Sequence, residues 1–126
     1  MPFREHTGEI GRRYGNCHCG AISFRFSAPA ITDAMLCNCS ICRRKGALLS
    51  TFLVPGEELT VDVRDNALAT YQFGTMVAKH QFCRVCGVSP FVSTRLNPGQ
   101  YRINLGCVEG LDLSGLEVID FDGTAI

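Results

Sequence analysis

Three cysteines, Cys37, Cys39 and Cys42, form the stretch of the chain with the clearest chemistry, because they follow one another in a C-x-C-x-x-C spacing. In an extended chain, residues i and i+2 point to the same side, so Cys37 and Cys39 can present both sulfur atoms to one point. The two-residue gap before Cys42 is the spacing with which a tight turn returns a third sulfur to a metal. Three thiolates leave one position of a tetrahedral zinc open, and an open position is typical of catalytic zinc sites.

Two further cysteine pairs, Cys17 with Cys19 and Cys83 with Cys86, also have the spacing of metal ligands. Glycines flank the first pair, and Gly87 follows the second as in a zinc knuckle, where glycine adopts a backbone conformation that other residues resist. A closed structural zinc needs four ligands, and the two pairs supply four. One zinc bound in this way would tie the first strand to a late hairpin and contribute folding energy.

Spacing alone leaves other partitions of the sulfur atoms open. Cys37 or Cys39, joined to Cys83 and Cys86, would also satisfy four-coordination. The triplet would form a second closed structural zinc if Cys107 or a histidine completed its shell. We otherwise expect Cys107, which follows a predicted strand and a glycine, to be a buried small apolar residue.

The composition indicates one globular domain. The chain has 126 residues, of which 46% are hydrophobic and 19% charged, so it is long enough to bury a core. Its 12 Lys and Arg residues balance 12 Asp and Glu residues, which argues against a general binder of nucleic acid or of a membrane surface. The apolar stretches are far shorter than a membrane span, and the N-terminus does not read as a secretory signal. We therefore expect a cytoplasmic protein, in which eight cysteines favour metal binding over disulfides.

Alternating apolar and polar residues between Gly and Pro turn signals predict a mainly β domain. We expect a loosely held lead-in over residues 1–14, a single domain over residues 15–126 and one helical turn over residues 40–45. The predicted strands cover Ile22–Phe26, Ile31–Cys37, Leu48–Val54, Leu59–Val63, Leu68–Phe73, Val77–Phe82, Phe91–Leu96, Tyr101–Leu105 and Leu116–Phe121.

The cysteine motifs resemble, in order and distance, those of the glutathione-dependent formaldehyde-activating enzyme family, which also includes centromere protein V. The motifs are Gly15–Gly20 (GNCHCG), Cys37–Arg44 (CNCSICRR) and Phe82–Gly87 (FCRVCG). Two further segments, Thr70–Gly74 (TYQFG) and Asn97–Gly99 (NPG), resemble the centromere protein V branch in particular. The similarity extends over nearly the whole chain from about residue 15 onward.

The resemblance implies an Mss4-like (β-tent) fold of packed antiparallel sheets braced by zinc. It implies a structural zinc on the four paired cysteines, Cys17, Cys19, Cys83 and Cys86. It implies a catalytic zinc on the triplet, Cys37, Cys39 and Cys42. It also implies an activity, the joining of glutathione to formaldehyde to give S-hydroxymethylglutathione, which is classed as a carbon–sulfur lyase reaction.

Glutathione carries two carboxylates, so cations near the triplet would help to bind it. The local supply is Arg43, Arg44, Lys45 and Lys79, for which the alternative is an ordinary solvated surface. His80 is a candidate proton shuttle or a support for a metal ligand, although a lone histidine in a strand is more often structural.

A second hypothesis is a non-enzymatic module, in which both zinc ions brace a surface for protein or chromatin contact. A fully closed shell of four residues around the second zinc would favour this module, and an exchangeable ligand would favour the enzyme. The sequence leaves open the substrate and the number of chains that associate.

Overall fold

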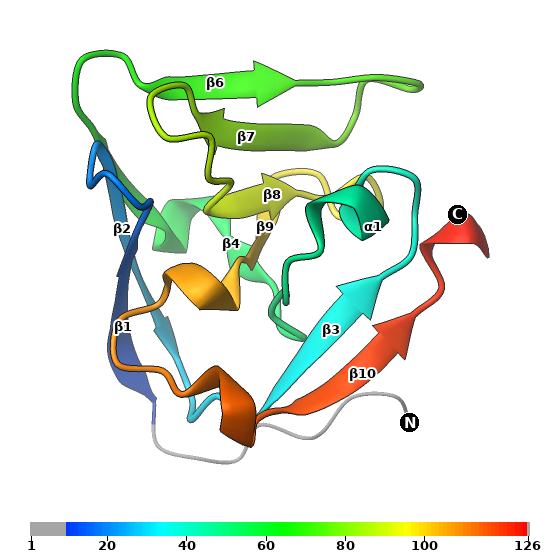
Figure 1. Ribbon diagram of the computed structural model, residues 1–126, viewed down its shortest axis with the longest axis horizontal. Coiled ribbons are helices and arrows are strands. Elements are labelled where there is room, and N and C mark those ends of the chain that lie inside the picture. Colours follow the sequence, from blue (N-terminus) through cyan, green and yellow to red (C-terminus); the bar gives the residue numbers. More distant parts are fainter. Residues whose placement is uncertain (1–9, 126) are drawn as a thin grey trace.

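The computed structural model describes residues 10–125 as a mainly β structure with three sheets and one short α-helix (Figure 1). The first sheet is antiparallel, has the order β1-β2-β5 and consists of β1 (Gly11–Asn16), β2 (Ile22–Ala28) and β5 (Thr60–Val63). The second is antiparallel, has the order β4-β9-β8-β7-β6 and consists of β4 (Val54–Pro55), β9 (Gln100–Ile103), β8 (Phe91–Ser93), β7 (Lys79–Cys83) and β6 (Leu68–Tyr71). The third pairs β3 (Asp33–Cys37) in parallel with β10 (Glu117–Phe121).

The helical segments are short. The α-helix α1 (Cys42–Lys45) is a single turn that ends at Gly46, whose φ of 67° is left-handed. Four 3₁₀ turns complete the described chain, namely η1 (Gly56–Glu58), η2 (Leu105–Cys107), η3 (Leu113–Gly115) and η4 (Gly123–Ala125). None of the helices within residues 10–125 is long and apolar enough to cross a membrane.

The main core lies between the first sheet and the five-stranded sheet. In Figure 1, β4, β8 and β9 of the five-stranded sheet lie between β1–β2 on the left and β3–β10 on the right. Phe24, Phe26 and Ala28 of β2 are buried, whereas the residues between them are less buried, as the alternation in the sequence predicts. The Phe24 ring packs edge-on against Phe91 of β8, with 5.7 Å between the ring centroids. Burial of each such phenylalanine contributes about 1.5–3 kcal/mol to the free energy of unfolding.

The expected mainly β architecture is confirmed, but the predicted strand over Leu48–Val54 is largely wrong. Only the end of that segment pairs as a strand, and Leu49 forms isolated bridges. The fully buried Ser50 donates a hydrogen bond to the Phe52 carbonyl at 2.8 Å and accepts one from the Ile103 amide at 2.9 Å. Because a serine hydroxyl competes with strand ladders for backbone groups, the chain bends here instead of continuing as a strand.

Two other differences concern the chain ends. Residues 11–14 of the expected lead-in form most of β1, which pairs with β2 from Gly11 opposite Ala28 to Asn16 opposite Ser23. Residues 1–9 of that lead-in lie outside the described residues. The pairing of β10 with β3 is parallel, whereas the antiparallel arrangement that we expected holds for the two larger sheets.

Gly15 of β1 is a position at which the fold excludes any side chain. A Cβ atom there would overlap the ring of Phe24 and lie 2.8 Å from the Cys107 carbonyl oxygen. We expect Gly15→Ala to lower the free energy of unfolding by about 1–3 kcal/mol, because overpacking forces neighbouring groups to move. Urea unfolding of the metal-loaded protein measures the change.

The matched control is Gly115→Ala, since a Cβ atom at Gly115 meets nothing within 4 Å. The control should change the free energy of unfolding by less than about 0.5 kcal/mol. Equal effects of the two substitutions would contradict the packing argument.

Candidate metal centres and the adjoining cavity

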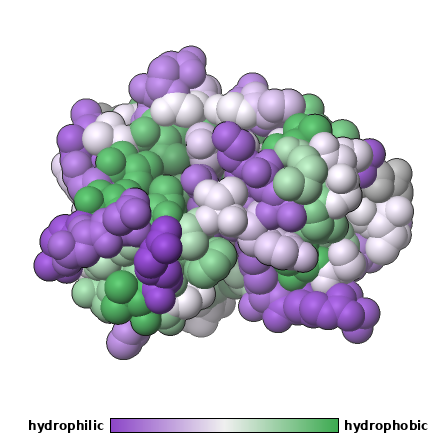
Figure 2. All heavy atoms as spheres, turned by 90° about the horizontal axis from the view of Figure 1, so that it is seen from above, coloured by the Kyte–Doolittle hydropathy of each residue, from purple (hydrophilic) through white to green (hydrophobic). Residues whose placement is uncertain are grey.

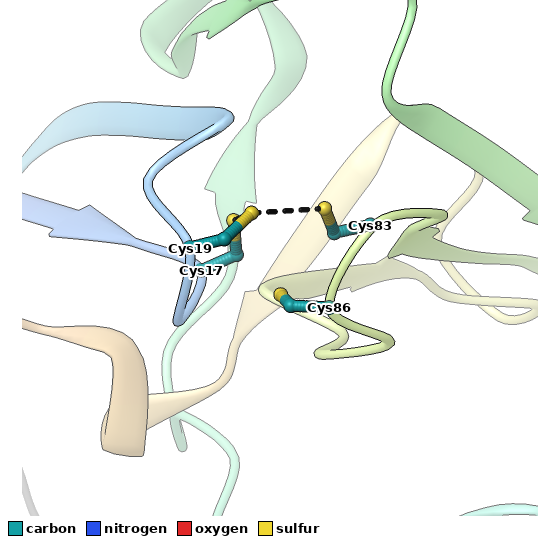
Figure 3. Close-up of side chains that lie close together, drawn as sticks. All are labelled: Cys17, Cys19, Cys83 and Cys86. Carbon is teal, nitrogen blue, oxygen red and sulfur yellow. Dashed lines mark hydrogen bonds between the residues drawn. The ribbon is translucent and has the colours of Figure 1, made fainter.

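The first cysteine cluster brings together two turns from distant parts of the chain. Cys17 and Cys19 lie in the turn between β1 and β2, while Cys83 ends β7 and Cys86 lies in the next turn (Figure 3). All four Sγ atoms lie within 4.8 Å of one another, and the Cys17–Cys19 and Cys19–Cys83 sulfur distances are both 3.7 Å. A tetrahedral zinc with metal–sulfur distances of about 2.3 Å requires sulfur–sulfur distances of about 3.8 Å, so these four residues fit the ion.

Backbone amides around this cluster favour the thiolate form that zinc binds. Hydrogen bonds from backbone amides, chiefly that of Cys86, hold the pKa of Cys83 below its ordinary value. The amide of Val88 is the main cause that lowers the pKa of Cys86 to about 6. Gly87 has a φ of 81°, which is the left-handed conformation expected of a knuckle glycine.

The second cluster is the triplet. Cys37 ends β3, Cys39 lies in the following turn and Cys42 begins α1. Their three Sγ atoms lie within 4.8 Å of one another, and within residues 10–125 no fourth Cys, His, Asp or Glu ligand atom joins the group. The triplet therefore offers three sulfur ligands to a metal, which fits a zinc with one position left for another molecule.

The observed grouping decides between the partitions that spacing left open. The sulfur atoms of Cys83 and Cys86 group with the first pair, so neither Cys37 nor Cys39 is shared with them. Cys107 lies in η2, half-buried, and belongs to neither cluster of the described residues. Burial raises the pKa of the Cys107 thiol to about 11, in keeping with the small apolar residue that the sequence predicts.

A cavity of about 490 Å³ opens beside the triplet. Its wall contains all three cysteines, and its other apolar residues are Met35, Ile41, Leu49, Phe73, Ala78, Val92, Leu96 and Phe121. Phe73 and Leu96 are 43% and 56% exposed, so they lie at the rim. Figure 2, which views the molecule from the side of β6 and β7, shows apolar surface on this face next to hydrophilic side chains.

The end of the described chain covers one side of the triplet. The Gly123 amide donates a hydrogen bond to Asn38 Oδ1 at 2.7 Å, and the Asn38 amide donates to the Phe121 carbonyl at 3.2 Å. Gly123 is buried so close to the triplet that a Cβ atom there would lie 2.5 Å from Cys37 Sγ and 2.8 Å from Cys39 Cβ. Gly123 has no signal in the sequence, because no local pattern links it to cysteines more than 80 residues earlier in the chain.

His80 of β7 lies in the wall between this cavity and a second one of about 530 Å³. The side chain is 6% exposed, and its ring stacks on Phe73 with 5.7 Å between the centroids. Lys45 Nζ lies 3.2 Å from His80 Nδ1. Burial, reinforced by the positive charge of Lys45, lowers the pKa of His80 to about 4.

The four cations that the sequence offered as carboxylate contacts are not in the cavity beside the triplet. Arg44 and Lys45 line the second cavity, and Arg43 and Lys79 line neither of the two. Among the described residues, the arginines in the wall of the first cavity are Arg95 and Arg102, which no sequence motif marked.

Arg102 is held in place by the bend that replaces the predicted strand. Its Nη1 donates hydrogen bonds to the carbonyls of Ser50 and Thr51 at 3.0 and 3.1 Å. Arg95 is exposed in the loop between β8 and β9. Arg102 is one residue from the fully buried Ile103, so strand alternation alone places it on the opposite face. No sequence signal marks Arg95.

Comparison with known proteins agrees with the motifs and the fold. The sequence model of a family described as glutathione-dependent formaldehyde-activating enzyme matches residues 12–117. Among solved structures, the chain is similar to the crystal structure of a Rhodobacter sphaeroides protein, with 36% sequence identity and a TM-score of 0.72. The match covers 83% of this chain and 97% of that one. The chain therefore belongs to the glutathione-dependent formaldehyde-activating enzyme family.

Proposed function

We propose that the protein is an enzyme that joins a small thiol to an aldehyde at a zinc ion held by Cys37, Cys39 and Cys42. Glutathione and formaldehyde are the pair that the family implies, with S-hydroxymethylglutathione as the product and a carbon–sulfur lyase as the class. The observation that carries the proposal is the incomplete shell: three sulfur atoms without a fourth ligand among residues 10–125, in the wall of a cavity.

We assign a structural role to the four-cysteine cluster. Its four ligands complete a tetrahedral shell, and none of them lines the cavity beside the triplet. The cluster links β1–β2 to β7 across 64 residues of sequence between Cys19 and Cys83. A metal bound there would contribute to folding, because the site does not exist in the unfolded chain.

The residues of the cavity bind and orient the substrates. Zinc on the triplet would hold a thiol substrate as the nucleophilic thiolate. A cavity of about 490 Å³ has the size of a small-molecule site. Its wall contains two arginines and no Asp or Glu among the described residues, so it attracts a carboxylate-bearing thiol. Met35, Leu49 and Val92 are buried apolar residues that keep water away from one side of the sulfur atoms.

Removal of one ligand from each cluster separates the two roles. We expect Cys39→Ser to lower the zinc content from two ions towards one per chain while the fold survives, because the triplet does not join distant sheets. We expect Cys83→Ser to unfold the domain, since a structural zinc contributes about 10 kcal/mol or more to folding. Metal analysis and circular dichroism on the two purified variants measure these outcomes.

The two variants serve as controls for each other, because each replaces one sulfur by one oxygen. If Cys39→Ser collapses the protein as severely as Cys83→Ser, both metals are structural and the enzyme proposal is wrong.

Arg95 tests how the cavity recognises the thiol. We expect Arg95→Gln to raise the Kd for glutathione about tenfold, the equivalent of one charge-assisted hydrogen bond to a carboxylate. The matched control is Arg12→Gln, which removes an exposed arginine on β1 that does not line the cavity. Calorimetric titration of both zinc-loaded variants gives the comparison, and equal affinities would show that Arg95 does not contact the substrate.

Substitution of Gly123 tests whether the segment after β10 fixes the positions of the triplet sulfur atoms. We expect Gly123→Ala to weaken zinc binding at the triplet about tenfold, because the added methyl displaces Cys37 Sγ or lifts the turn away from it. Competition with a chromophoric chelator measures the affinity of each site, and the four-cysteine site should keep its affinity. The control is Gly115→Ala in another 3₁₀ turn, and an unchanged triplet affinity in Gly123→Ala would contradict the contact.

A further inference from the structure

The contact between Lys45 and His80 determines which ring nitrogen of the histidine carries hydrogen. Lys45 Nζ lies 3.2 Å from His80 Nδ1, within hydrogen-bond distance. An ammonium group has three N–H donors and no acceptor, so Lys45 donates and Nδ1 accepts. Nδ1 therefore carries no hydrogen while this bond exists.

A second set of hydrogen bonds holds Lys45 in place. Its Nζ also donates to Ser89 Oγ at 3.3 Å, and Ser89 Oγ donates to the Gln81 carbonyl at 2.7 Å. Asn104 Nδ2 donates to the Ser89 carbonyl at 2.9 Å. The ammonium group is thus positioned by groups on the strand of His80 and on the segment that follows it.

The histidine ring is neutral and held in a fixed plane. It is 6% exposed and faces a positive charge, and both conditions disfavour a second proton. Phe73 stacks on the ring, with an angle of 27° between the two planes. A neutral imidazole has one N–H group. If one ring nitrogen accepts a hydrogen bond, the other nitrogen carries the hydrogen.

The position of the ring decides where that N–H group acts. His80 lines both cavities, whereas Lys45 lines the second cavity and is absent from the wall of the cavity beside the triplet. Nδ1 faces the lysine, so Nε2 is the ring nitrogen that this contact leaves free to act in the other cavity that His80 lines, the one that contains the three sulfur atoms.

We infer that Lys45 fixes His80 as the Nε2–H tautomer and that His80 thereby presents an N–H donor to the aldehyde oxygen in the cavity beside the triplet. This inference rests on the proposed function. It makes His80 a catalytic residue and Lys45 a positioning residue.

The donor assists the addition of the thiolate to the aldehyde. The substrate thiolate attacks the aldehyde carbon, a C–S bond forms from a sulfur lone pair, and the C=O π pair moves onto oxygen. The Nε2–H group donates a hydrogen bond to that oxygen and stabilises its negative charge. The proton that the thiol lost on ionisation returns to the oxygen through water and completes the hydroxyl group, so no oxidant or reductant is needed.

The tautomer can be measured without any assay of activity. We would record long-range ¹H–¹⁵N correlations on the ¹⁵N-labelled, zinc-loaded protein and assign the His80 signals by their loss in His80→Gln. In the wild type, Nε2 should show a pyrrole-like ¹⁵N shift and Nδ1 a pyridine-like shift. In Lys45→Met the two shifts should move towards each other as both tautomers become populated, whereas Lys45→Arg should retain the wild-type pattern.

The matched control for this measurement is Lys79→Met. Lys79 is the residue before His80 in β7, so the variant removes the same charge without removing the hydrogen bond to Nδ1. Its His80 shifts should equal those of the wild type. A wild-type Nδ1 that is pyrrole-like, or a tautomer that Lys45→Met leaves unchanged, would overturn the assignment.

Kinetics test the role of the donor. Adduct formation from glutathione and formaldehyde should lose about 10²-fold in kcat in His80→Gln, the usual effect of removing one oxyanion donor, with little change in KM. Lys45→Met should lose about tenfold in kcat, as a positioning residue does. If the tautomer is as expected but His80→Gln keeps its kcat, the donor role is wrong. If the zinc-loaded wild type forms no adduct, the proposed function and the donor role both fail, and the spectra still decide the tautomer.

Discussion

Four sulfur atoms that must meet within 4.8 Å constrain the whole domain. They come from the turn that follows β1, from the last residue of β7 and from the turn after it, and β1 and β7 belong to different sheets. Each turn has its own glycine in a left-handed conformation, Gly20 and Gly87, so the backbone can fold closely around the sulfur atoms. With a metal at this point, the first sheet and the five-stranded sheet are fixed to each other at one edge, while the phenylalanines of β2 pack between them.

This constraint lets the second cluster remain incomplete. The hydrophobic core joins the two larger sheets, and a metal on the four-cysteine cluster would brace them further, so the triplet is not required for that contact. The triplet is local in sequence. Its three cysteines fall within a span of six residues, which runs from the end of β3 through one turn to the start of α1. The strand beside the triplet also positions it, because β10 pairs in parallel with β3 and leads directly to Gly123, which lies against Cys37. Three sulfur atoms fixed in this way would leave one position of a tetrahedral metal without a ligand from the described residues.

The sequence predicted the parts of the site that depend on spacing and missed the parts that depend on folding. The C-x-C and C-x-x-C spacings marked the seven sulfur atoms as metal ligands, because the geometry of such pairs is set over a few residues, while the division into four and three that the resemblance implied is the one that the fold brings together. The mainly β class follows from alternation in the same way. Arg95 reaches the cavity from the loop that joins β8 to β9, and Arg102 is held there by hydrogen bonds to the carbonyls of Ser50 and Thr51 in the bend after Leu49. Such side-chain hydrogen bonds to backbone groups leave no periodic signal in the sequence.

The sequence predicted the helical turn of α1 but not the different positions of its three cations, Arg43, Arg44 and Lys45. The helical turn over residues 42–45 was expected within residues 40–45, and in a helix residues three apart share a face. Lys45 therefore lies on the face of Cys42, and both line a small pocket whose wall contains neither Arg43 nor Arg44. Treating the three cations as one basic cluster hides this difference. Helical periodicity separates them and singles out Lys45, because the turn that begins at Cys42 carries its fourth residue towards His80.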